Sequence, residues 1–445
     1  MPAPGPGVTP TSGRGVVAPG SSLLRFAAIG SVDDGKSTLI GRLLHDTKQL
    51  FDDQLEALST ASRRRGAEGI DLSFVTDGLR AEREQGITID VAYRYAATPL
   101  RKFVIADCPG HVQYTRNMAT GASTADLAVV VVDATAGLRQ QTRRHCCIAA
   151  LLGVRHLLVA ANKMDLADWD EATYRSVDTE MRSLARRLGI ETVITVPVSA
   201  LRGDNVVEAS ERSPWYEGPT VLEALEAAPT NAWVTEGGAG ARLPVQWVVR
   251  HPGGGRSYAG MVSGGTLHAG DEVVVLPAGG RSRIDSVGTF DGVLQQATSS
   301  LSVTVSLGDD LDVGRGDLIA PVDGAPEVLR EFEATVCWFG EQPVEVGRRF
   351  RVKHTTRITP ARLVALEGRL DVDSLALVAT DVLEQNDIGV GRIAVATPIA
   401  ADLYQVNRVT GSFVIIDEAT NATVAAGMVG APAMVGADAD GDATR

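Results

Sequence analysis

One short segment constrains the fold of this chain more than any other. Residues 30–37 read Gly-Ser-Val-Asp-Asp-Gly-Lys-Ser, which fits the pattern G-x-x-x-x-G-K-[S/T]. An apolar run at Leu24–Gly30 precedes the segment, and a helical pattern at Lys36–Asp46 follows it. In that context the glycines let backbone N–H groups turn inward around phosphate oxygens at a helix N-terminus. The pattern alone also fits ordinary glycine turns, but between a strand and a helix it predicts a phosphate-binding loop in an α/β domain.

The rest of the first half agrees with an α/β domain, because short apolar runs alternate with helical stretches. We expect strands at 24–30, 102–107, 127–133, 156–162 and 192–199, and helices that include 36–46, 141–152 and 220–227. Residues 230–242 are poor in large apolar side chains and contain three glycines, as linkers do. Beyond them, short alternating strands broken by Gly, Asp and Pro predict two small β-barrels.

The expected fold class is therefore an α/β P-loop domain followed by two small antiparallel β-barrels. We place the α/β domain at 23–229, the linker at 230–242 and the barrels at 243–326 and 327–430. Residues 1–22 are rich in Gly, Pro, Ser and Thr, and residues 431–445 in Gly, Ala and Asp. We expect both ends to be disordered, and the first lacks the apolar core of a secretory signal.

Composition narrows the cellular setting and the partners. No run of about 18 apolar residues exists, so no membrane span is expected. The four cysteines show no metal or disulfide spacing, which suits a reducing cytoplasm. The formal net charge is −13, and this acidic total argues against nucleic acid as the main partner, although it leaves room for a local basic patch.

Two motifs predict phosphate chemistry. Lys36 is expected to reach the β- and γ-phosphates, and the Ser37 hydroxyl to ligate Mg²⁺. The segment 107–111 reads Asp-Cys-Pro-Gly-His at the end of the second strong strand. There Asp107 can hold Mg²⁺ through water, Gly110 can offer its N–H to the γ-phosphate, and His111 stands where an attacking water must be oriented. A turn with an incidental histidine is the plainer alternative.

Two further motifs predict a guanine site. The segment 162–165 reads Asn-Lys-Met-Asp after the fourth strand, and the Asp165 carboxylate can accept both the N1 hydrogen and the 2-amino hydrogens of guanine. Adenine lacks that pair of donors, and such sites discriminate by roughly four to five powers of ten. Residues 199–201 read Ser-Ala-Leu and are expected to supply a backbone N–H near the guanine oxygen. A switch segment, Arg83–Ile89, carries Thr88, whose hydroxyl can ligate Mg²⁺ only while the γ-phosphate is present.

The complete set of residues expected to bind GTP comes from these loops. They are Gly30, Ser31, Val32, Asp33, Asp34, Gly35, Lys36, Ser37, Thr38, Asp107, Cys108, Pro109, Gly110, His111, Asn162, Lys163, Met164, Asp165, Ser199, Ala200 and Leu201. Ser37, Thr88 and Asp107 are the expected Mg²⁺ ligands, and His111, Lys36 and Gly110 the expected catalytic residues.

With these motifs in this order, the chain resembles the translation-factor GTPases, the group that contains elongation factor Tu. The resemblance implies that Thr88 is the switch ligand, that His111 is the catalytic histidine, and that Val32 and Ile87 flank it as an apolar gate. It also implies, more weakly, that Asp33 helps to hold a monovalent cation at the phosphates.

Within that group the sequence departs from the elongation factors. They usually read G-H-V-D-H-G-K, whereas here Asp34 takes the place of the second histidine. Asp34, the segments 37–47 and 76–95, and the barrel segments 270–277, 289–292, 407–413 and 420–424 resemble the GTPase subunit of bacterial sulfate adenylyltransferases.

This second resemblance implies a heterodimer with a small catalytic subunit that joins ATP and sulfate to give adenosine 5′-phosphosulfate and pyrophosphate. GTP hydrolysis on the large subunit would drive that uphill reaction. Some relatives carry a fused adenylylsulfate kinase domain, but this sequence shows no second P-loop, so we do not expect that activity.

Two alternatives remain open at this point. An elongation-factor-like GTPase that carries RNA is favoured by the basic stretch at 348–357, although strand alternation puts only some of these residues on one face. A regulatory subunit that binds GTP without hydrolysing it is disfavoured by the intact His111.

Overall fold

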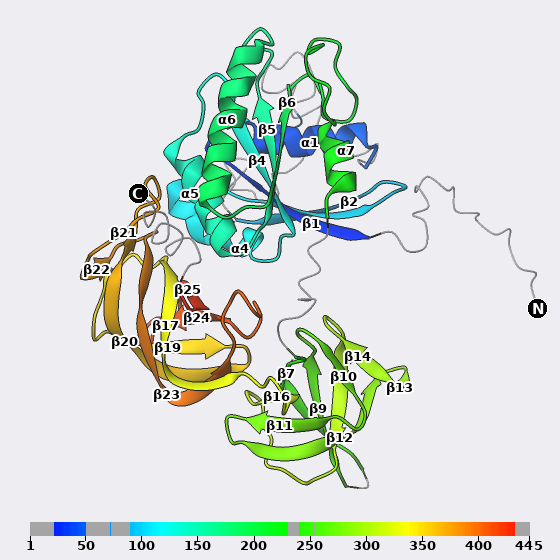
Figure 1. Cartoon of the computed structure of the whole chain (residues 1–445), viewed down its shortest axis with the longest axis vertical. Coiled ribbons are helices and arrows are strands. Elements are labelled where there is room, and N and C mark those ends of the chain that lie inside the picture. The colour runs from blue at the N-terminus through cyan, green and yellow to red at the C-terminus, as the bar shows by residue number, and fades with distance from the viewer. Residues whose placement is uncertain (1–21, 50–71, 73–89, 230–239, 253, 432–445) are drawn as a thin grey trace, which may run out of the picture. The chain divides into compact units, whose positions relative to one another are not determined.

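The computed structural model describes residues 22–49, 72, 90–229, 240–252 and 254–431 (Figure 1). By its internal contacts the chain divides into two compact units, residues 1–186 with 190–230 and residues 187–189 with 231–445. The ends that we expect to be disordered and most of the expected linker lie outside the described residues.

The first unit is built on a six-stranded sheet in the order β2-β3-β1-β4-β5-β6. Its strands are β1 (Leu23–Ile29), β2 (Ala92–Ala97), β3 (Lys102–Asp107), β4 (Leu127–Asp133), β5 (His156–Asn162) and β6 (Thr192–Pro197). All run parallel except β2, which pairs antiparallel with β3 at the edge. Every residue of β4 and β5 is buried, as central strands covered on both faces require.

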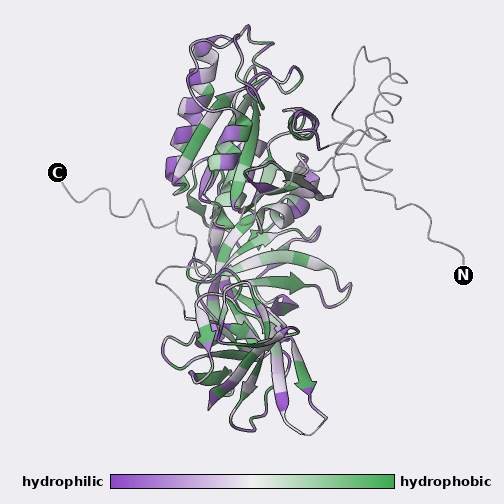
Figure 2. Ribbon diagram, turned by 90° about the vertical axis from the view of Figure 1, so that its right-hand side faces the viewer, coloured by the Kyte–Doolittle hydropathy of each residue, from purple (hydrophilic) through white to green (hydrophobic). Residues whose placement is uncertain are grey.

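Helices cover both faces of this sheet. They are α1 (Lys36–Asp46), the 3-10 turn η2 (Val112–Tyr114), α4 (Thr115–Ala122), α5 (Gln140–Leu151), α6 (Glu171–Arg187) and α7 (Val221–Ala227). Apolar residues of α1 and α7 share one core cluster with β1, β3 and β4, whereas α4 and α5 contact each other and β1. Figure 2 shows these strands mostly in green beside helices that carry purple residues. None of the described helices is long and apolar enough to cross a membrane.

The parallel strands bring the predicted motifs to one edge of the sheet. The carboxyl ends of β1, β3, β5 and β6 lead into residues 30–37, 107–111, 162–165 and 199–201 respectively. Ligands of open α/β sheets bind at this edge because the loops that follow the strands gather there.

From residue 240 onward, the described residues of the second unit form strands and no helix. Its first sheet has the order β7-β16-β11-β12-β15-β9-β8, with β13 on β12, and β10 pairs with β14 separately. The bounds are β7 (Leu243–Pro244), β8 (Trp247–Arg250), β9 (Arg256–Met261), β10 (Thr266–His268), β11 (Glu272–Leu276), β12 (Gly280–Thr289), β13 (Gly292–Leu294), β14 (Gln296–Thr298), β15 (Ser302–Leu307) and β16 (Leu318–Pro321). The sheet curls back on itself where Arg242 and Ser263 exchange backbone hydrogen bonds of 2.8 Å.

The second sheet closes completely. Its order is β19-β24-β25-β17-β23-β20, and β20 pairs in turn with β19. The bounds are β17 (Glu327–Trp338), β18 (Val344–Glu345), β19 (Arg349–His354), β20 (Arg357–Leu370), β21 (Leu377–Val378), β22 (Val382–Leu383), β23 (Ile388–Ala401), β24 (Ser412–Ile416) and β25 (Thr423–Val429). The predicted fold class, an α/β domain followed by antiparallel β-barrels, is confirmed.

Individual strand bounds differ from the prediction where the backbone turns. The sequence pattern predicts one continuous barrel strand at 258–267, but β9 ends at Met261 and β10 begins at Thr266, because Gly264 and Gly265 turn the chain with positive φ angles (68° and 41°). The strand expected at 192–199 ends at Pro197. Sequence patterns do not indicate β2 as a strand, because an edge strand exposes side chains such as Tyr93 and Tyr95 and lacks a buried apolar run.

Candidate nucleotide-binding site

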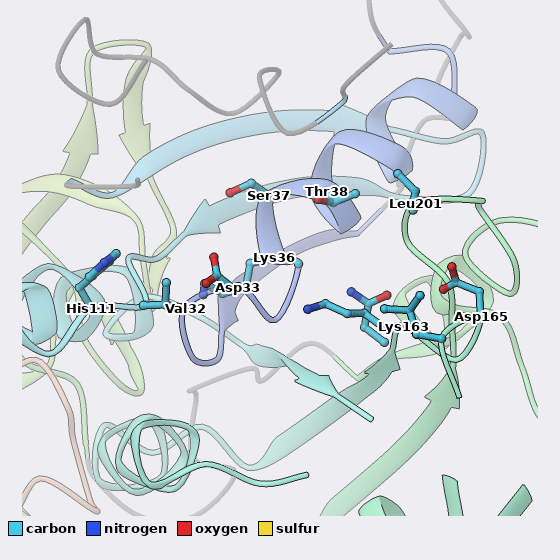
Figure 3. Close-up of a pocket in the computed structure, with 13 residues that line it drawn as sticks. Val32, Asp33, Lys36, Ser37, Thr38, His111, Lys163, Asp165 and Leu201 are labelled. Carbon is cyan, nitrogen blue, oxygen red and sulfur yellow. The ribbon is translucent and has the colours of Figure 1, made fainter. Parts of the chain in front are cut away.

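A cavity of about 500 Å³ opens at the carboxyl edge of the parallel sheet (Figure 3). It is lined by Val32, Asp33, Gly35, Lys36, Ser37, Thr38, Gly110, His111, Asn162, Lys163, Asp165, Leu166 and Leu201. All of these except Leu166 belong to the predicted set. In Figure 3 His111 and Val32 lie at one end and Asp165 and Leu201 at the other. The cavity therefore joins the predicted phosphate motifs to the predicted base motifs.

The remaining predicted residues do not line the cavity and lie buried in the same loops. They are Gly30, Ser31, Asp34, Asp107, Cys108, Pro109, Met164, Ser199 and Ala200, and all are buried. Met164 and Cys108 are fully enclosed in the core, so their side chains space the motifs. Burial raises the pKa of the Cys108 thiol because it removes the group from water, so the thiol stays neutral.

The P-loop needs glycine at its last turn. Gly35 has φ +93°, and a Cβ there would lie 2.3 Å from the Asn162 side-chain nitrogen. The next residue, Lys36, begins α1, and its ammonium donates to the carbonyls of Gly30 (3.1 Å) and Ser31 (2.6 Å). Burial lowers the pKa of Lys36, although the nearby Asp107 carboxylate raises it in part. A buried cation at a helix N-terminus is an arrangement that suits a phosphate group.

Asp34 lies beneath this loop with its side chain only 2% exposed. Its Oδ2 accepts the Ser31 N–H at 2.8 Å, which closes the turn from inside. Burial raises the pKa of Asp34, and the Ser31 N–H and the charges of Lys36 and Arg139 offset only part of that rise.

The segment after β3 packs directly against the P-loop. A Cβ on Gly110 would lie 2.6 Å from the Lys36 ammonium and 3.0 Å from the Val32 nitrogen, so a side chain there would crowd the P-loop and displace Lys36. The next residue, His111, is partly buried, with its ring centre 6.2 Å from that of Tyr114 in an edge-to-face arrangement. His111 and Val32 thus occupy the end of the cavity where a γ-phosphate would project.

The described residues fit a magnesium ion only in company with a nucleotide. Ser37 faces the cavity from the first turn of α1, and Asp107 is fully buried at the end of β3. Among the described residues no group of three His, Cys, Asp or Glu side chains could hold a metal. A hydroxyl and a carboxylate beside phosphate oxygens is the donor set that Mg²⁺ takes in nucleotide sites. Thr88 and Ile87 lie outside the described residues.

Asn162 ties the two halves of the site together. Its amide nitrogen donates to the Asp34 carbonyl at 2.8 Å, and its oxygen accepts the Ala200 N–H at 2.9 Å. Arg42 of α1 adds hydrogen bonds to the carbonyls of Ala200 (3.2 Å) and Leu201. The loop expected to meet the guanine oxygen is therefore fixed to the P-loop through one buried side chain and one arginine.

Charges flank the predicted base pocket on both sides. Lys163 has φ +63°, and its ammonium lies 2.7 Å from Asp133 Oδ2 at the end of β4. Burial alone would raise the pKa of Asp133, but hydrogen bonds from Lys163 and Thr135 more than offset it and hold the pKa below its usual value. Asp165 lies 3.5 Å from the Arg202 guanidinium. Sequence reasoning missed Arg42, Asp133 and Arg202, because each acts across the fold and lies outside any motif.

Known proteins match most of this chain. The elongation factor Tu GTP binding domain family matches residues 21–230, and the GTP-eEF1A C-terminal domain-like family matches residues 331–430. The "Sulfate adenylyltransferase subunit 1" of Chromobacterium violaceum is 48% identical over 416 residues, covering 92% of this chain and 86% of that protein.

Two longer relatives have bifunctional names. The "Bifunctional enzyme CysN/CysC" of Mycobacterium tuberculosis is 50% identical and the "Bifunctional enzyme NodQ" of Rhizobium sp. is 48% identical, each over 92% of this chain. The chain spans about two thirds of their length, 67% and 63% respectively. A solved structure of Sup35 with GDP overlaps with a TM-score of 0.41 at 23% identity, covering 92% of this chain and 94% of the Sup35 chain.

Proposed function

The chain belongs to the sulfate adenylyltransferase subunit 1 family of translation-factor-like GTPases, and from that premise we propose how it contributes to sulfate activation. It binds GTP and hydrolyses it, and the hydrolysis drives a partner subunit that forms adenosine 5′-phosphosulfate and pyrophosphate from ATP and sulfate. The observation that carries this proposal is the single cavity in which the P-loop, His111 and Asp165 meet.

The geometry supports a division of roles along the cavity. Lys36 and the N–H groups at the start of α1 hold the phosphates, while Asp165 and Lys163 receive the guanine at the far end. Bound Mg²⁺, held by Ser37, Asp107 and the switch residue Thr88, would neutralise charge on the β- and γ-phosphates. Asp33 is the exposed P-loop residue placed to help with a monovalent cation.

His111 is the residue that we assign to the attacking water. It projects at the phosphate end beside Val32, so its ring can orient a water molecule in line with the γ-phosphate. Because phosphoryl transfer depends on positioning and charge stabilisation, loss of this ring removes orientation and leaves the binding contacts intact.

Guanine recognition also requires a backbone N–H that can donate to the guanine oxygen. The Ala200 N–H donates to Asn162, and the Ser199 N–H donates to the Asp204 carbonyl at 3.3 Å. We propose that the N–H of Leu201, which lines the cavity, meets the guanine oxygen, or that Asn162 releases Ala200 on binding.

The partner is the small catalytic subunit, and we expect the complex in the cytoplasm. The ATP and sulfate chemistry belongs to that subunit, because the cavity described above is the only nucleotide motif site that the described residues and the sequence supply. The name "subunit 1" of the relatives agrees with such a multi-subunit enzyme.

The RNA-carrying alternative loses support from the basic stretch itself. Arg348 pairs with Asp417 at 3.3 Å and lies over the Trp338 ring. His354 is buried against the Thr410 carbonyl at 2.7 Å, and Arg357 pairs with Asp317 at 2.5 Å. A surface that binds phosphates needs cations that face solvent, and three of the six basic residues in 348–357 instead make contacts within the fold.

The test is GTP turnover by the purified chain, alone and with the candidate small subunit, ATP and sulfate. We expect stimulation by the small subunit, with adenosine 5′-phosphosulfate accumulating in step with GTP loss. Stimulation only by ribosomes with aminoacyl-tRNA would instead make the chain a translation factor. In either setting His111→Ala is expected to slow turnover by about 10²-fold or more while GTP binding is retained; retained turnover would remove His111 from its role.

A further inference from the structure

The back of the P-loop is held by the helix that follows β4. Thr142 and His145 lie three residues apart on α5, so both face the same side of the helix. The Thr142 hydroxyl lies 2.8 Å from the Ser31 hydroxyl, and the Gly30 N–H donates to His145 Nδ1 at 3.4 Å. Both α5 residues are fully buried. They anchor the first two residues of the loop to a rigid element.

Arg139 continues this row of contacts one turn earlier. It is the N-cap residue of α5, and its guanidinium Nη1 donates to the Val32 carbonyl at 3.0 Å. The same Nη1 lies 3.7 Å from Asp34 Oδ1, which is buried and has no hydrogen-bond partner among the described residues. Arg139 thus contacts the loop on both sides of Asp33, whose φ is +63°.

These contacts hold the turn around Asp33, a non-glycine residue with a positive φ angle. A residue with positive φ costs conformational free energy unless its neighbours hold it there. The Asp34 carboxylate holds the turn from inside through the Ser31 N–H, but its buried charge is balanced only in part by Lys36. The Arg139 cation near Oδ1 adds to this compensation without completing it, and its hydrogen bond ties the Val32 carbonyl to α5.

We propose that Arg139 is a positioning residue for the phosphate site, which holds the Val32–Asp34 turn in its nucleotide-bound shape and thereby slows the release of GDP. This inference rests on the proposed GTP site and names a determinant of nucleotide exchange within it. Arg139 itself does not line the cavity, so it acts through Val32 and Asp34. Because Val32 lies beside His111, a shift of its peptide also disturbs the hydrolytic step.

The test measures the dissociation rate of fluorescently labelled GDP from the full chain after a chase with unlabelled GDP. Arg139→Ala is expected to release GDP about fivefold faster, the effect of losing one hydrogen bond of ordinary strength. Arg143→Ala is the matched control, because Arg143 sits on the same helix but pairs with Glu180 at 3.2 Å. The Arg139 side chain is 44% exposed, so its loss leaves the melting temperature within a few degrees of the wild type.

A second variant separates positioning from charge. Arg139→Gln keeps a donor for the Val32 carbonyl without the charge and is expected to release GDP at a rate between those of the wild type and Arg139→Ala. In an Asp34→Asn background, Arg139→Ala should have a smaller effect, because the charge pair is already lost.

The outcomes discriminate clearly. If Arg143→Ala accelerated GDP release as much as Arg139→Ala, the positioning role would be overturned. It would also be overturned if Arg139→Gln released GDP as fast as Arg139→Ala while Arg139→Lys behaved as the wild type, because charge alone would then matter. Unchanged release in Arg139→Ala would overturn it outright while leaving the GTP site intact. A wild-type chain that fails to bind labelled GDP would instead overturn the proposed function.

Discussion

The ion pair between Arg242 and Asp402 provides the strongest single test of how the two barrels are joined. Arg242 begins the first barrel, and Asp402 directly follows β23 of the second. The guanidinium meets the carboxylate with two hydrogen bonds, of 3.0 and 2.9 Å, and its side chain is only 2% exposed. It also donates to the Gly324 carbonyl at 2.7 Å, so the pair is both bidentate and buried.

Asp402→Leu is the informative change, because it leaves the guanidinium buried without a counter-charge. Breaking a buried pair from one side costs about 3–5 kcal/mol, most of which is the penalty of the stranded charge. The double variant Arg242→Met with Asp402→Leu removes both charges and fills a similar volume. It is expected to fall within about 1 kcal/mol of the wild type, which gives a coupling free energy of at least about 2 kcal/mol.

Hydrogen exchange followed by mass spectrometry is the suitable assay, since a chain of several domains does not unfold in one step. The opening free energy of peptides from β16 and β23 reports on the two barrels separately. Exposed pairs such as Arg175 and Glu171, 3.0 Å apart on α6, serve as controls that should cost less than about 1 kcal/mol. A loss below about 1 kcal/mol in Asp402→Leu, or single losses that simply add in the double variant, would refute the reasoning.

Three further predictions concern the α/β unit. Asp165→Asn should weaken GTP binding by about 10³-fold and improve binding of xanthosine triphosphate, measured by competition, because two charge-assisted hydrogen bonds to guanine are lost; unchanged preference would place base recognition elsewhere. Burial lowers the pKa of His145 to about 3, so between pH 6.5 and that value the unfolded chain binds a proton that the folded chain does not. Stability in urea should therefore fall as the pH drops below about 6.5, by up to about 1.4 kcal/mol per pH unit, and His145→Asn should flatten that slope; an equal slope in the variant would contradict the assignment. Arg101 donates to the carbonyls of Leu225 and Glu226, both at 3.0 Å, at the end of α7. Arg101→Ala should destabilise that helix by about 2 kcal/mol in hydrogen exchange, and protection as in the wild type would show that water replaces the arginine.

The sequence predicts central elements of this fold well, and the reason is physical. The bounds expected for β3, β4, β5 and α1 match the structure residue for residue. β4 and β5 are buried along their whole length, and β3 and β5 each end in a motif, so the apolar character or the end of each strand is marked locally. The barrels are harder, because short strands on a curved sheet break wherever glycine or a bridge turns the chain, as at residues 262–265.

The edge strand β2 shows the complementary limit. Only Ala96 of its six residues is buried, whereas Tyr95 is 75% exposed. This edge strand is defined by its backbone pairing with β3, and its exposed positions carry Tyr93 and Tyr95 while Arg94 is half-buried, so hydropathy does not follow exposure along it. Its existence follows from long-range contacts that a single sequence does not display.

Asp34 shows where sequence reasoning about the site reaches its end. Its identity is visible in the chain as a departure from the elongation-factor pattern, and its place in the P-loop follows from the motif. Its partner is not visible, because Arg139 lies more than a hundred positions away and belongs to no motif. Only the packing of α5 against the loop brings the two together. A motif therefore locates the atoms that meet the nucleotide. The residues that we propose to control nucleotide release lie outside the motif, and they are found from the element that contacts each buried, incompletely paired group of the motif.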